Sequence, residues 1–463
     1  MKKLLPLVLI STGLLSGCLM GPKYRRPAAN VPPSYRAASP EQTTASSLGN
    51  EQWWQVYQDP VLAELIHKAL AQNYDVRIAA ARILEAQAQL GIIRSNQFPS
   101  ASVGADIFSQ QNAKISNQFP AYQVNAGELN LGVIWNLDFW GKYRRQTEAA
   151  RAEVLATEWG QRAVLSSLVA NVATAYFQLR ALDSQLEISN RTLASRQQSL
   201  VLTQLLETHG SASGLDVSQS EQLVYTASET IPDLERQIQQ QENLLSILLG
   251  ENPGPIARGR ALTEQPLPQN VPAGLPSELL EHRPDVRQAE EILVAANAQV
   301  GVAKASFFPS LSLTGLGGLE SNALHKFISE PSETWYGALS VSQPLFQGGA
   351  LRSGLRLARA NWQEAVLSYQ QTVQSALGQV SDALIASHKN REFREQQDLL
   401  TQAAQRSDQL SQVLYQHGGA SYLQVLTNET NYFSAELNLV QAQLSERLAL
   451  VQLYQALGGG WQQ

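Results

Sequence analysis

This 463-residue chain contains a single cysteine, two methionines and only 16% charged residues. One cysteine cannot form an internal disulfide, which excludes both a disulfide framework and cysteine-rich zinc ligation. The formal net charge of −6 offers no basic surface for nucleic acid, so we expect no nucleic-acid partner. With 44% apolar residues the chain can bury a sizeable core, which excludes a wholly disordered protein.

Enzyme motifs are also missing from the sequence. The six histidines show no HExxH or paired-ligand spacing, and neither GxxxxGK[ST] nor a nucleophile elbow occurs. Three glycines at 315, 317 and 318 resemble a nucleotide loop, but they lie in an alternating segment and Glu320 follows them. We therefore expect no enzyme activity, no metal site and no cofactor.

The first 17 residues predict an export signal. Two lysines precede an apolar stretch from Leu4 to Leu15, which is too short to span a bilayer core about 30 Å thick. The stretch ends in LSGC, which resembles the bacterial lipobox, where cleavage precedes a cysteine that carries S-diacylglycerol and an N-acyl chain. Cys18 would then be the lipid anchor, and Leu19 in place of Asp favours the outer membrane. An ordinary signal peptide followed by a buried thiol is the alternative.

The second half of the chain repeats the first at a shift of about 208 to 210 residues. The motifs DVR at 75–77 and FPS at 98–100 recur at 285–287 and 308–310. Further matches join His209, Gly210, Ser213, Leu215 and Gly250 to His417, Gly418, Ser421, Leu423 and Gly458. The repetition predicts two structurally equivalent halves, 60–250 and 283–458.

Three segments lie outside these halves. A lipidated, extended N-terminal segment is expected over 18–59, and a short tail over 459–463. Residues 251–282 are rich in proline, which predicts a linker without strand or helix.

Each half contains two short segments in which apolar and polar residues alternate, near 100–110 and 122–138 and near 309–320 and 334–346. One face carries Val103, Ile107, Leu129, Leu131, Val133, Trp135, Leu311, Leu313, Leu319, Trp335, Leu339, Val341 and Leu345. This pattern is typical of barrel strands that face lipid, although a soluble sheet with one wet face gives it too. Four strands cannot close a barrel, whereas three chains would supply twelve.

Long helical stretches follow the strands. Residues Lys142 to Thr208 and Leu351 to Gln416 contain little glycine or proline, and each would extend for about 100 Å as a helix. Their sparse apolar residues favour coiled-coil packing around a hydrated lumen. The helices break at 209–214 and 417–421, which predicts two hairpin tips in which Ser213 and Ser421 cap the next helix.

Several motifs together resemble the TolC-like outer-membrane factors, in particular their lipoprotein branch. These are GPKYRRP after Cys18, WW at 53–54 followed by DP at 59–60, LLEHRPDVR at 279–287 and LYQALGGGW at 453–461. The resemblance covers the whole chain. It implies an α+β membrane protein, tandemly duplicated, in which a homotrimer forms a twelve-stranded outer-membrane β-barrel continuous with a long periplasmic α-helical barrel. It also implies outer-membrane lipid, a periplasmic adaptor and an inner-membrane pump, proton-driven and of the RND type, as partners.

The resemblance also assigns roles at the hairpin tips. Gly210 and Gly418, beside Ser213 and Ser421, would allow the hairpins of the adaptor to approach the backbone closely. The alternative is that both glycines are plain helix C-caps, and the two roles are compatible. Its periplasmic gate maps to Asp216, Tyr415, Leu423, Gln424 and Thr427.

Each gate residue carries its own expectation. Asp216 and Tyr415 match a pair that joins neighbouring coils by a hydrogen bond. The alternative is that Asp216 only stabilises a helix start and that Tyr415 only packs in the coil. Leu423 matches an apolar constriction, or is plain packing. Gln424 and Thr427 stand where relatives place pore-ring aspartates, and Ala420 replaces a basic residue. We therefore expect no cation-blocked entrance and a closed state held less by charge.

The main prediction is the exit duct of a tripartite pump that passes drugs or toxic compounds. Metal-ion efflux and type I protein secretion are alternatives within the channel class. A structural coiled-coil tether without a pore, and a periplasmic adaptor, are the alternatives outside it; the four alternating strands disfavour the tether.

Overall fold

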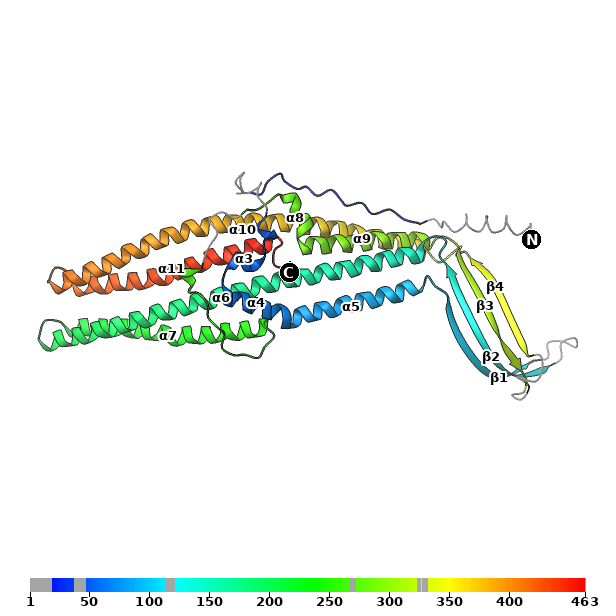
Figure 1. Ribbon diagram of the computed structural model, residues 1–463, viewed down its shortest axis with the longest axis horizontal. Coiled ribbons are helices and arrows are strands. Elements are labelled where there is room, and N and C mark those ends of the chain that lie inside the picture. Colours follow the sequence, from blue (N-terminus) through cyan, green and yellow to red (C-terminus); the bar gives the residue numbers. More distant parts are fainter. Residues whose placement is uncertain are drawn as a thin grey trace. The chain divides into compact units, whose positions relative to one another are not determined.

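The computed structural model describes residues 19–36, 47–113, 121–265, 272–322, 326 and 332–462. A series of elements occurs twice along them (Figure 1). The first series is α4 (Pro60–Gln72), α5 (Tyr74–Ser95), β1 (Ser100–Asn112), β2 (Tyr122–Leu137), α6 (Lys142–Thr208) and α7 (Gly214–Leu248). The second is α8 (Pro276–His282), α9 (Pro284–Ala305), β3 (Ser310–Ser321), β4 (Glu333–Ser342), α10 (Ala350–Gln416) and α11 (Tyr422–Ala456). The predicted duplication is confirmed.

The chain folds as two compact units. The first comprises Met1–Ala28, Arg82–Glu158 and Gln288–Gln370, and the second comprises Ala29–Ala81, Trp159–Arg287 and Gln371–Gln463. Helices α5, α6, α9 and α10 each contribute residues to both units.

The first unit contains a four-stranded antiparallel sheet in the order β1, β2, β3, β4 (Figure 1). Its register places Leu131 between Val103 on β1 and Gly317 on β3, and Leu313 between Trp135 and Leu339. Most apolar residues of this face are exposed in the single chain, Ile107 and Trp335 to 84% each, while Leu311 and Leu319 are half-buried. Such a row is typical of a strand face that meets lipid.

One strand ends earlier than predicted. β4 stops at Ser342, so Leu345 does not belong to the strand face, although its side chain is 94% exposed. Pro344 explains the difference, because proline has no backbone N–H to donate to a ladder.

The long helices begin and end almost where the sequence predicts. α6 spans Lys142–Thr208 and α10 spans Ala350–Gln416, one residue longer than expected. Each lies antiparallel beside the helix that follows it: Gln241 of α7 donates to the Ala175 carbonyl of α6, and Gln397 of α10 donates to the Ala435 carbonyl of α11 (Figure 1). Within the described ranges, no helix combines the length and the apolar character that crossing a bilayer requires.

The second unit has a core that includes the segment from Trp53 to Asp59. Trp53 is 1% exposed, and the Tyr57 ring lies 5.9 Å from that of Tyr454. Asp59 caps α4 by accepting from the Val61 backbone N–H at 2.9 Å, and its other carboxylate oxygen accepts from the Tyr176 hydroxyl at 3.0 Å. The WW and DP motifs therefore build this core.

Two sequence-based expectations about irregular segments are wrong. The 18–59 segment is not extended throughout, since 3₁₀ helix η1 (Leu48–Asn50) and helix α3 (Trp53–Tyr57) lie within it. The 251–282 segment includes 3₁₀ helix η2 (Leu262–Glu264) and helix α8. Pro276 occupies the first turn of α8, where its missing N–H and its fixed φ favour a helix start.

Candidate functional site

The two hairpin tips turn on equivalent glycines. Gly210 and Gly418 have φ values of +73° and +74°, and the next residues, Ser211 and Gly419, donate at 2.8 Å to the carbonyls of Leu206 and Leu414. This bond pattern is that of a Schellman cap, so the C-cap interpretation is confirmed for both glycines. A Cβ at either would meet nothing within 4 Å, which leaves the backbone of both turns open to a partner.

Serines start the returning helices, as predicted, but the two repeats differ. Ser213 and Asp216 form a full capping box, in which the Ser213 backbone N–H donates to Asp216 Oδ2 at 2.8 Å. Ser421 accepts from the Gln424 backbone N–H, and Gln424 occupies the position equivalent to Asp216. The carboxylate that closes the first cap is therefore absent from the second.

The predicted constriction and ring residues share an exposed face of α11. Leu423 is 61% exposed, and Gln424 and Thr427 are exposed with it, while Tyr422 and Val425 are buried. Leu423 and Thr427 are four residues apart, and the Thr427 hydroxyl donates to the Leu423 carbonyl at 2.8 Å. The exposed face is available to line a lumen, and that role stays a prediction.

Tyr415 lies under the tip of the second hairpin. Its ring centroid is 5.2 Å from that of Tyr422, and both rings pack with Leu223, Val425 and Leu426. Burial, and after it the charge of Asp216, raises the pKa of Tyr415. The Asp216 carboxylate accepts two hydrogen bonds from Ser213, one from its backbone N–H and one from its hydroxyl. Its role as a lock between coils stays a prediction.

A cluster of hydroxyl groups joins the two hairpins just behind the tips. Thr203 of α6 donates to the Tyr422 hydroxyl of α11 at 3.2 Å, and Ser220 of α7 hydrogen-bonds the same hydroxyl. Thr203 and Ser220 are each 2% exposed, and Tyr422 is 9% exposed. We call these three residues the tip hydroxyl cluster. Since it is buried, parting the hairpins would leave its groups without partners until water enters.

Buried charges lie farther from the tips. The Arg196 side chain is 1% exposed; its Nη1 donates to the Leu223 carbonyl at 2.8 Å, and its Nε lies 4.0 Å from Glu429 Oε1. Burial raises the pKa of Glu429, against the opposite effect of Arg196. Burial also raises the pKa of Asp408, opposed by the Gln412 amide and assisted by the charge of Glu436. The pKa values of both carboxyl groups are therefore higher in the folded hairpins than their ordinary values.

These shifts predict a pH dependence for the variant Asp408→Asn. A carboxyl group whose folded pKa is raised contributes stability that is present below its unfolded value, here 3.8, and lost as pH rises through the folded value. The asparagine variant cannot ionise, so its thermal midpoint should exceed that of the wild type at pH 8, and the gain should vanish near pH 4. Circular dichroism at 222 nm measures both midpoints.

The matched control for this variant is Asp398→Asn. Asp398 accepts from Gln402 four residues on, as Asp408 does from Gln412, but at a more exposed position of α10. A gain for Asp408→Asn that is equal at both pH values would show that packing rather than charge is responsible.

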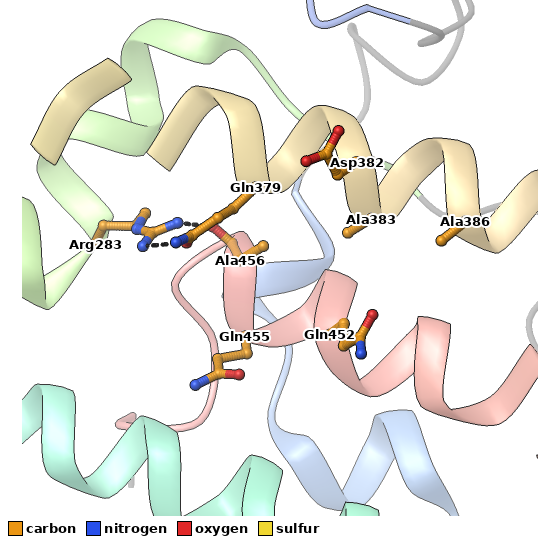
Figure 2. A pocket seen from close by; sticks show the side chains of 8 residues that line it. All are labelled: Arg283, Gln379, Asp382, Ala383, Ala386, Gln452, Gln455 and Ala456. Atoms are coloured by element: carbon orange, nitrogen blue, oxygen red, sulfur yellow. Dashed lines mark hydrogen bonds between the residues drawn. The ribbon is translucent and has the colours of Figure 1, made fainter. Parts of the chain in front are cut away.

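A polar cavity of about 460 Å³ lies beside Arg283 of the HRPDVR motif. Figure 2 shows Arg283 directed toward Gln379 of α10 and Ala456 at the end of α11. Its guanidinium donates to Gln379 Oε1 at 2.8 Å, to the Ala456 carbonyl at 3.1 Å and to both carboxylate oxygens of Asp285. Arg283 therefore joins the start of α9 to α10 and α11.

Sequence reasoning missed the tip hydroxyl cluster and Arg196. Thr203 lies eight residues before Ser211, and Ser220 lies eight residues after Ala212, so the symmetry of an antiparallel hairpin could have paired them. No sequence signal links either one to Tyr422. Cys18 lies outside the described residues. Among the described residues, no group of three or more His, Cys, Asp or Glu side chains could hold a metal ion.

Comparison with known proteins assigns the chain to a family. The sequence profile of the Outer membrane efflux protein family matches residues 65–251 and again residues 275–459. The probable efflux pump outer membrane protein TtgC of Pseudomonas putida is 35% identical, over 99% of this chain and 96% of its own. The cation efflux system protein CusC of Escherichia coli is 33% identical, over 97% of each.

A solved structure shows the same architecture. The outer membrane channel MtrE of Neisseria gonorrhoeae superposes with a TM-score of 0.87 at 29% identity, over 96% of this chain and 99% of that one. The fold class predicted from the sequence, a duplicated α+β chain of the outer membrane, is thus confirmed. The chain belongs to the outer membrane efflux protein family and is an outer-membrane efflux channel protein that extends into the periplasm.

Proposed function

We propose that three copies of this chain form the homotrimeric exit duct of a tripartite efflux pump. The observation that carries the proposal is the open sheet: among the described residues, β1 and β4 each pair on one side only. An exposed strand edge is a template for pairing, and further copies of the chain provide equivalent edges. The duct conducts passively and catalyses no reaction.

The hairpin tips dock a periplasmic adaptor in this proposal. Both turns expose backbone at Gly210 and Gly418, where a partner helix can approach closely. The adaptor connects the duct to an inner-membrane pump, for which we propose a proton-driven pump of the RND type. The support comes from the family and from the geometry of the tips.

Small toxic organic molecules are the proposed cargo. Relatives 34% to 35% identical are named for antibiotic, solvent or toluene efflux. Metal-ion efflux is the second candidate, because the relative CusC is named for cation efflux. Selection between these cargoes would lie in the pump, since the chain itself provides a conduit.

An acyl anchor on Cys18 completes the proposal. The only cysteine of the chain stands at the lipobox position. In cells fed radiolabelled palmitate, the wild type should incorporate label and Cys18→Ala should not. Equal labelling of both proteins would contradict the anchor.

Photo-crosslinking from the tip tests the duct assignment. A photoreactive residue at Gly419 is tolerated sterically, since a Cβ there comes no closer than 3.4 Å to Leu414. We expect a covalent adduct with the adaptor of a proton-driven pump, identified by mass spectrometry. Tyr225, which is 67% exposed on α7, provides the control position. An adduct with the adaptor of an ATP-driven exporter would indicate secretion instead, and adducts with cell-wall components alone would indicate a tether.

A further inference from the structure

The first described residues of the chain belong to the first unit and pack against its helices α6 and α9. We call residues 19–26 the N-terminal strap. The Met20 backbone N–H donates at 3.2 Å to the carbonyl of Trp140, in the turn that joins β2 to α6. At the other end, Arg26 forms two hydrogen bonds with the Glu290 carboxylate of α9, at 2.6 and 2.7 Å, and the Tyr24 hydroxyl donates to it at 3.2 Å. Glu290 is buried, so these bonds are protected from water.

One buried arginine holds the middle of the strap. The Arg145 side chain is 3% exposed, and its Nε and Nη2 donate to the carbonyls of Met20 and Pro22 at 2.9 and 3.2 Å. Its remaining terminal nitrogen pairs with Glu148 at 2.7 Å. From α9, the Asn297 amide donates to the same Pro22 carbonyl at 3.2 Å. Side chains of two helices therefore satisfy the backbone of an otherwise irregular segment.

Glycines permit the close approach. Gly21 has a φ of +102°, and a Cβ there would lie 2.5 Å from the Cα of Gly301 on α9. A Cβ on Gly301 would in turn lie 2.8 Å from the Met20 carbonyl oxygen. Where the strap begins, a Cβ on Gly141 would lie 2.6 Å from Leu19 Cδ1. Residues 19–21 therefore fit closely against Gly141 at one end and against Gly301 at the other.

Aromatic side chains surround the point where the strap begins. The Trp140 ring is stacked on Phe308 at 4.8 Å and lies edge-on to Phe139 at 5.0 Å. Aromatic rings of this kind are enriched at the boundary between bilayer and water. The strap therefore starts at the ends of the strands, where acyl chains can enter the bilayer.

We propose that the strap positions the lipid anchor and that Arg145 is its positioning residue. Cys18 directly precedes Leu19, so docking of the strap holds the acylated residue beside the turn between β2 and α6. A free N-terminal segment would let the anchor sample many positions, whereas a docked one keeps it at the level of the sheet and raises its effective concentration there. The proposal rests on the acylation of Cys18 proposed above.

Limited trypsin digestion tests the docking. The strap contains two trypsin sites, after Lys23 and after Arg25, because Pro27 blocks cleavage after Arg26. Cleavage is followed by intact mass. Arg145→Met should increase the cleavage rate at least tenfold, and Arg145→Lys, which keeps one charged donor, should give an intermediate rate. Arg151→Met, at an exposed position of α6, is the matched control and should leave the cleavage rate unchanged. Unchanged protection in Arg145→Met would overturn the proposal.

A second variant tests the docking in case Arg145→Met fails to fold. Gly301→Ala adds one methyl group toward the Met20 carbonyl and favours helix formation in α9, so it should undock the strap in a folded protein. A photoreactive residue at Leu19 should crosslink to the peptide containing Gly141 in the wild type and lose this product in Gly301→Ala. Retention of the product would count against the docking geometry.

A double-variant comparison separates positioning from a purely structural role. Arg145→Met should lower the amount of inserted protein several-fold in the acylated background and cause no further loss in Cys18→Ala. An equal loss in both backgrounds would show that Arg145 only supports the fold. The mass of the N-terminal peptide reports acylation separately, so an absent acyl group would reject the anchor itself while the trypsin result still stands.

Discussion

Tyr422→Phe is expected to raise the conductance of the channel in a planar bilayer. The substitution removes the hydroxyl that Thr203 and Ser220 share, and so takes away two hydrogen bonds between the hairpins just behind the tips. At about 0.5–1.5 kcal/mol net for each bond, the loss is about 1–3 kcal/mol. If the parted hairpins conduct, their population should rise roughly 5- to 150-fold. Single-channel recording gives the open probability.

Tyr225→Phe is the control for this prediction. Tyr225 is 67% exposed on α7, so loss of its hydroxyl should leave the open probability unchanged. A second variant, Ser220→Ala, removes one partner of the cluster and should give an effect in the same direction but smaller. The prediction fails if Tyr422→Phe conducts like the wild type while retaining its thermal stability, because the cluster would then not restrain opening.

Arg283→Met should destabilise the second unit by about 1–3 kcal/mol, the cost of leaving a buried hydrogen-bond acceptor without its donor. Arg283 is 7% exposed and donates to Asp285, Gln379 and the Ala456 carbonyl (Figure 2). Methionine keeps the apolar stem of the side chain but leaves the buried Ala456 carbonyl without this donor. Intrinsic tryptophan fluorescence during heating should show a midpoint several degrees lower.

Arg406→Met provides the matched control, since Arg406 is an exposed arginine of α10. Its midpoint should stay within the error of the wild type. If Arg283→Met also unfolds like the wild type, water in the cavity satisfies the groups that the guanidinium leaves, and the arginine is not needed to join the three helices.

Local patterns predicted much of the fold. The ends of α6 and α10, the alternation in the strands and the glycines at both tips follow from residues close together in the chain. Helix periodicity, strand alternation and cap chemistry depend on near neighbours. Each pattern also occurs a second time, about 208 to 210 residues further along the chain. The failures also had local causes: Pro276 starts a helix inside a proline-rich segment, and Pro344 ends a strand early.

The sequence alone determined the duplication, the four strands, the long helices, the tip caps and the family resemblance. Only the tertiary structure decided which distant side chains meet. Tyr422 lies 202 residues from Ser220, and Tyr24 lies 266 residues from Glu290. Such contacts depend on how helices pack and on which backbones can approach, as at Gly21 and Gly301, and no spacing along the chain encodes these distances.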